Sequence, residues 1–105
     1  MDEHAWPSGP EVPAAGLLRE GWAATVAALP VGTQITGKVI GRQRFGVFIR
    51  IDGVPYAIGL AEITAMPLGM DLPALGAFVR GEVIWHATHN HQVKVRLDEW
   101  RAVNE

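Results

Sequence analysis

The chain of 105 residues contains no cysteine, and this absence excludes several kinds of site at once. Disulfide bonds, thiolate zinc centres and cysteine nucleophiles all need the missing thiol, so stability must come from packing. The chain also lacks the run of about 18 to 20 apolar residues that is needed to cross a bilayer. Residues 1–13 carry acidic side chains where a signal peptide begins with basic ones. We therefore expect a cytoplasmic protein with no membrane partner.

Residues suited to catalysis or metal binding are also sparse. Ser8 is the only serine, and the chain has no glycine-rich phosphate loop of the recognised forms. Three histidines, His86, His89 and His91, lie within six residues. Neither a cysteine nor a nearby acidic residue completes a tetrahedral metal site there, so we interpret this stretch as a polar turn. The sequence predicts that the protein is not an enzyme and holds no cofactor or metal.

Charge is distributed unevenly along the chain. The net charge is −2 overall, but residues 32–97 contain seven basic and four acidic side chains, a net charge of +3. The seven cations are Lys38, Arg42, Arg44, Arg50, Arg80, Lys94 and Arg96. A mildly basic module with acidic ends is compatible with a phosphate ligand, although an ordinary solvated surface would show a similar balance.

The N-terminal third divides into two parts. Prolines and glycines interrupt residues 1–13 without any apolar period, which predicts a disordered segment. In residues 14–30, apolar side chains recur every three or four positions, and Pro30 then ends the pattern. This stripe predicts an amphipathic helix that packs on the domain that follows; it consists of Leu17, Leu18, Trp22, Val26 and Leu29.

The apolar period changes to two after Gly32, which is typical of strands. Five stretches show it, at residues 35–40, 46–51, 56–60, 79–86 and 93–97. The residues between the third and fourth stretches predict a short helical turn and a loop. This order predicts an all-β fold, a five-stranded OB-type barrel at residues 31–98, with residues 99–105 as a C-terminal tail. We interpret the four tryptophans as core or helix-packing residues, with Trp85 facing inward.

Four short motifs occur in a recognisable order. They are Gly37-Lys38-Val39, Phe45-Gly46-Val47-Phe48-Ile49, Gly59-Leu60-Ala61-Glu62-Ile63 and Leu75-Gly76. In this order they resemble the S-one domain, the RNA-binding OB module repeated in the largest protein of the bacterial small ribosomal subunit, here in a standalone form. The resemblance covers about residues 30–98. It implies that Phe45 and Phe48 lie on the face that receives nucleic acid.

Aromatic rings suit this task because stacking a base on a ring contributes roughly 1 to 3 kcal/mol without requiring a particular sequence. Strict alternation, however, places Phe45 and Phe48 on opposite sides of a strand. Both reach one face only if Gly46 permits a bulge or sharp twist, and otherwise one of them is a core residue.

Alternation also predicts which cations share the outer face. If Val93 and Val95 point inward, then Lys94 and Arg96 point outward. By the same pattern Lys38 and Arg50 lie outside on their strands. These four side chains are candidates to neutralise phosphates. The resemblance implies such a role most directly for Lys94, whereas a purely solvated role remains open for Arg96.

The resulting prediction is a module that binds single-stranded or unpaired RNA with low sequence specificity, by stacking on the two phenylalanines and by phosphate neutralisation. Three positions depart from the S-one pattern. Glu62 stands where family members commonly have a histidine, and a carboxylate repels phosphate. The aspartate usual in the last hairpin has no clear counterpart near Asn90, and Arg42 falls where an apolar residue is usual. The alternative is therefore a protein interaction module that docks through its N-terminal helix or its barrel surface.

Overall fold

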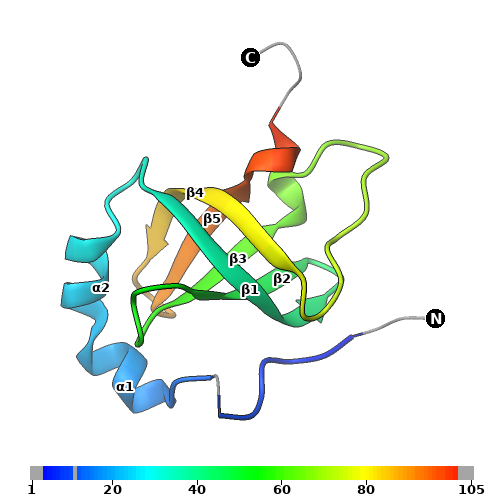
Figure 1. Ribbon diagram of the computed structural model, residues 1–105. Helices are drawn as coiled ribbons and strands as arrows, with labels where there is room; N and C mark the ends of the chain where they lie inside the picture. The colour runs from blue at the N-terminus through cyan, green and yellow to red at the C-terminus, as the bar shows by residue number, and fades with distance from the viewer. Residues whose placement is uncertain (1–3, 11, 102–105) are drawn as a thin grey trace.

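Five strands pair into a closed barrel (Figure 1) in the computed structural model, which describes residues 4–10 and 12–101. The strands are β1 (Gln34–Gln43), β2 (Gly46–Ile51), β3 (Ile58–Glu62), β4 (Phe78–Ala87) and β5 (Gln92–Leu97). Their order around the barrel is β1-β2-β3-β5-β4, and β4 pairs back to β1. Strands β3 and β5 run parallel. The predicted five-stranded OB-type barrel is confirmed.

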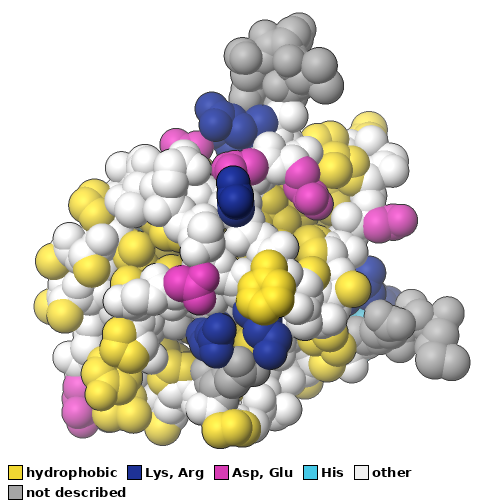
Figure 2. Space-filling model, in the orientation of Figure 1, with side chains coloured by type: hydrophobic (Ala, Val, Ile, Leu, Met, Phe, Trp, Pro, Cys, Tyr) yellow, Lys and Arg dark blue, Asp and Glu magenta, His cyan; other side chains and the backbone are white. Residues whose placement is uncertain are grey.

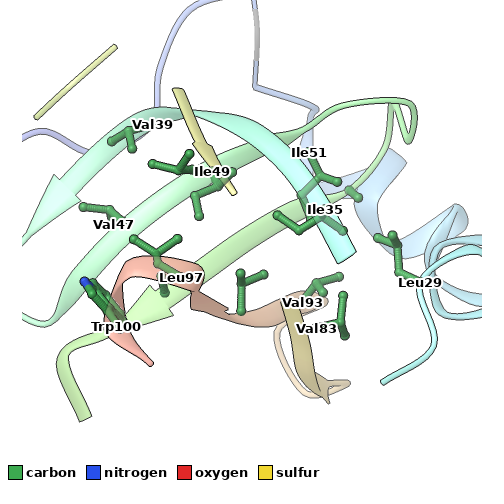
Figure 3. Close-up of a cluster of buried hydrophobic side chains, with 14 residues drawn as sticks. Leu29, Ile35, Val39, Val47, Ile49, Ile51, Val83, Val93, Leu97 and Trp100 are labelled. Carbon is green, nitrogen blue, oxygen red and sulfur yellow. The ribbon is translucent and has the colours of Figure 1, made fainter. Parts of the chain in front are cut away.

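The barrel core is built from the inward side chains of alternating residues (Figure 3). On β2 and β5 these residues are at most 2% exposed, and they are Val47, Ile49, Ile51, Val93, Val95 and Leu97. Burying a side chain of this size stabilises the fold by roughly 1.5 to 3 kcal/mol. The period of two therefore predicted the inner face of both strands correctly.

Two short helices replace the single helix expected at residues 14–30. They are α1 (Ala15–Glu20) and α2 (Trp22–Ala28), and they meet at Gly21, a residue of low helix propensity. The break lets Leu18 of α1 pack on the outside of the barrel while Trp22 packs against the core. Leu17 is 43% exposed and so does not belong to the buried stripe. No helix in the described ranges is long and apolar enough to span a membrane.

A large side chain lies at each end of the barrel core. Leu29, which follows α2, lies at one end of the core cluster, and Trp100 lies at the other (Figure 3). Trp100 belongs to a short 3-10 helix, η2 (Asp98–Trp100), and is only 2% exposed. The core thus extends into the expected C-terminal tail, whose residues 102–105 lie outside the described part. A second 3-10 helix, η1 (Ile63–Ala65), is the helical turn predicted after the third strand.

The N-terminal segment also differs from the expectation of disorder. Residues 1–3 and 11 lie outside the described part, but Ala5 pairs with Arg42 of β1 through two backbone hydrogen bonds of 2.7 Å. The register of β1 with β4 ends at Lys38, so β1 continues past its partner strand. Ala5 satisfies the backbone groups of Arg42 on that open edge.

Candidate nucleic-acid interface

The strand register places the predicted site residues on one side of the sheet. Opposite residues in neighbouring strands share a face. Phe48 of β2 lies opposite Leu60 of β3, which in turn lies opposite Lys94 of β5. In the next outward row, Lys38 lies opposite Arg50. We call the outward side of β1, β2, β3 and β5 the outer wall.

The rings of Phe45 and Phe48 converge on the outer wall. Their centroids are 5.9 Å apart and the ring planes meet at 89°, an edge-to-face contact. Gly46 makes this possible, because a Cβ at that position would overlap the carbonyl oxygen of Ala61 on β3. Gly46 also has a φ of 156°, a backbone conformation that other residues rarely adopt. The alternative, that one of the two is a core residue, holds for Phe48, which is buried in a second hydrophobic cluster apart from the barrel interior.

Phe48 is nevertheless covered. It is 4% exposed and packs with Ile58 and Leu60 in an outer cluster that Leu18 of α1 also contacts. Phe45 is 39% exposed. The two phenylalanines therefore share a face but do not offer equal surfaces to a ligand.

A third ring joins this cluster. The ring of Trp6 lies 6.0 Å from that of Phe45 and 5.9 Å from that of Phe48, and its side chain is 63% exposed. Interpreting Trp6 as a core or helix-packing residue was wrong. An isolated tryptophan within a proline-rich segment was the only signal in the sequence that singled it out.

Most of the predicted cations have a carboxylate beside them. Lys94 Nζ lies 3.2 Å from Glu62, which stands on the same wall at the end of β3. Arg50 lies 3.8 Å from Asp52 in the hairpin after β2. Because exposed ion pairs contribute only about 0 to 1 kcal/mol, an incoming phosphate can compete with Asp52 for Arg50. The Lys94 side chain is less accessible, at 16% exposed. The wall is therefore mixed in charge rather than uniformly basic.

Arg96 stands apart from the other cations. It donates from Nη2 to Glu82 of β4 at 3.0 Å, and both side chains are more than two-thirds buried. Its cross-strand partner is Glu82 rather than a residue of the outer wall. The pattern predicted its outward direction correctly, but the structure directs its charge toward β4.

Three exposed side chains near the wall were not among the predicted site residues. Trp85 is 64% exposed, and its expected inward position is wrong because the register of β4 shifts between Val83 and Trp85. Phe78 lies opposite Lys38 and is 80% exposed, and Arg44 is exposed next to Phe45. Figure 2 shows hydrophobic, basic and acidic side chains interspersed on the face it presents.

Trp22, His86 and His91 form a separate aromatic group. Trp22 makes edge contacts with His86 and His91, with ring centroids 6.3 Å and 5.6 Å away, and His86 Nε2 lies 2.6 Å from the Leu29 carbonyl oxygen. Within residues 4–10 and 12–101, no three histidine or acidic side chains are grouped so that they could hold a metal ion.

Comparison with known proteins identifies solved structures of similar fold. No family model and no curated protein matches the chain. Among solved structures it is similar to RNase R of Mycoplasma genitalium, with a TM-score of 0.61 and 16% identity over 74% of this chain and 15% of that one. It is also similar to GSP13 of Bacillus subtilis, with a TM-score of 0.57 and 24% identity over 73% of this chain and 62% of that one.

A third similar structure is the a/eIF2alpha-aDim2p-rRNA complex of Pyrococcus horikoshii, with a TM-score of 0.56 and 16% identity over 66% of this chain and 44% of that one. The chain therefore spans well under two-thirds of RNase R and of this third protein. At these identities the likeness concerns the fold. The chain has the fold of an S-one type OB domain.

Proposed function

We propose that the outer wall binds single-stranded or unpaired RNA with little sequence preference, and that the protein acts in the cytoplasm as a binding module rather than as a catalyst. The observation that carries this proposal is the exposed ring of Phe45, held beside Phe48 on the wall that also bears Lys38, Arg50 and Lys94. One RNase R structure of similar fold contains single-stranded RNA, and the a/eIF2alpha complex contains rRNA, which supports the proposal.

The chemistry assigns different tasks to these side chains. Phe45 stacks on a base, and Phe48 supports it from below. Lys38 and Arg50 lie directly opposite each other and neutralise neighbouring phosphates. Lys94 neutralises a phosphate on the β5 side of the wall. Contacts of these kinds position a strand without reading its sequence. Arg96 contributes least, because Glu82 holds its guanidinium.

The test is a titration of the full chain with a fluorescein-labelled oligouridine of about 12 nucleotides, within the site size of an OB fold. At about 50 mM salt we expect micromolar or tighter binding that weakens as salt rises, with a slope near −0.7 for each phosphate neutralised. Phe45→Ala should weaken binding by about 5- to 100-fold. The matched control is Tyr56→Ala, which removes an exposed ring in the β2–β3 hairpin and should leave binding unchanged. A lack of binding at low salt refutes the proposal.

A second candidate function is docking to another protein through the barrel surface or the helices. The observation in its favour is that Asp52, Glu62 and Glu82 accompany the predicted cations. Capture of interacting molecules with and without nuclease separates the two functions. A defined protein that binds the purified chain after nuclease treatment, together with a failed RNA titration, supports docking.

A further inference from the structure

The N-terminal segment is held on the barrel at a defined place. The two hydrogen bonds between Ala5 and Arg42 fix its backbone at the open edge of β1. Pro7 then lies against Gly41, where a Cβ would be only 2.7 Å from the proline ring. The missing side chain of Gly41 thus creates the space through which the segment crosses the outer wall.

Farther along, the segment passes the β2–β3 hairpin. Pro10 lines a surface hollow together with Arg50, Val54 and Pro55. Figure 1 shows the segment running along the barrel before it enters α1. The contacts of Ala5 with Arg42 and of Pro7 with Gly41 therefore determine which way the residue between Ala5 and Pro7 faces.

That residue is Trp6, and it changes which rings a ligand can reach. Phe48 has almost no exposed surface, whereas Trp6 is 63% exposed and its ring lies about equally far from those of Phe45 and Phe48, at 6.0 Å and 5.9 Å. A hydrophobic lid would turn its ring inward and bury most of its area. Trp6 instead covers Phe48 and leaves most of its own indole open to solvent.

We propose that Trp6 is a base-stacking residue of the RNA site and takes the role that Phe48 cannot perform. The inference rests on the proposed function and names a specific ligand contact: one base stacks on the indole of Trp6 and its neighbour on Phe45. The ring centroids are 6.0 Å apart, so two successive unstacked bases can each reach a ring. The N-terminal segment is thereby part of the binding site.

The experiment compares two variants on two ligands. Trp6→Leu keeps an apolar cover over Phe48 but removes the aromatic face, and Trp6→Phe keeps a smaller face. Each is titrated with the oligouridine and with an abasic ribose-phosphate oligomer of the same length and charge. Tyr56→Leu serves as the control for loss of an exposed ring, and circular dichroism and thermal melts show that every variant is folded.

We expect Trp6→Leu to bind oligouridine about 5- to 100-fold more weakly and to bind the abasic oligomer as the original chain does, because stacking requires a base. Trp6→Phe should lose only a few-fold. If Trp6→Leu binds oligouridine equally well, the inference is wrong. If it binds more tightly, the segment is a cover over the site, and the inference is likewise wrong. If the original chain does not bind RNA at low salt, the proposed function itself fails and the inference fails with it.

Discussion

Replacing Glu62 with glutamine tests whether the outer wall is the surface that meets phosphate. The carboxylate lies 3.2 Å from Lys94 Nζ, and the two side chains are 40% and 16% exposed. A phosphate that binds Lys94 would place its charge about 4 to 5 Å from the carboxylate. At that separation the repulsion is about 1 kcal/mol in a water-like dielectric and somewhat more at a partly buried site. Glu62→Gln should therefore tighten RNA binding by about five- to tenfold.

The same variant should alter the salt dependence. Once Glu62 no longer competes for Lys94, that lysine neutralises its phosphate more completely, which makes the slope of log K against log salt steeper by at most about 0.7. Fluorescence anisotropy of labelled oligouridine across a salt series measures both quantities. The cost in folding stability should stay below about 1 kcal/mol, because the lost ion pair is partly exposed.

Asp71→Asn is the matched control, since it changes the net charge equally and removes an exposed carboxylate from the loop between β3 and β4. We expect it to change affinity by no more than about twofold, the effect of overall charge alone. Equal gains in the two variants would show that the effect is not local to the wall. No gain in Glu62→Gln would refute the assignment of Lys94 to a phosphate.

Three further variants test the fold, each measured by urea denaturation. Gly46→Ala forces a methyl group against the carbonyl oxygen of Ala61 and should cost about 1 to 3 kcal/mol; an unchanged midpoint would contradict this close approach. Trp100→Ala should cost about 3 to 5 kcal/mol by opening a cavity, and a negligible loss would mean that the chain beyond β5 is a tail. Arg42→Met loses hydrogen bonds to the carbonyl groups of residues 72–73 and should cost about 1 kcal/mol, with faster proteolysis of that loop; equal protease resistance would exclude such an anchor.

The barrel itself was predictable because its determinants are local. The period of two decides which side chains of β2 and β5 point inward, and a strand with one buried face cannot shift by a single residue without exposing its core. The outward direction of Lys94 and Arg96 follows from the same rule. Gly46 was identified in advance as the residue on which a shared face for the two phenylalanines depends.

The apolar periodicity gave wrong predictions where a bulge or a helix break changed which side chains face the core. The bulge in β4 turns Trp85 outward, although simple alternation places it in the core. Gly21 likewise divides the apolar stripe between two helices and leaves Leu17 exposed. Sequence periodicity carries no signal for an inserted residue or a break until the partner elements are known.

The composition of the candidate site depended on contacts between residues far apart in the chain. Ala5 pairs with Arg42 because β1 extends beyond its pairing with β4. Trp6 reaches the phenylalanines because Gly41, which has no side chain, leaves space for Pro7. Lys94 meets Glu62 because β3 and β5 are neighbours in the barrel. The sequence alone determined the barrel and the inner and outer faces of β2 and β5, since alternation is a property of each regular strand. Only the tertiary structure decided which rings are exposed and which cations have partners, since both depend on how separate segments pack against one another.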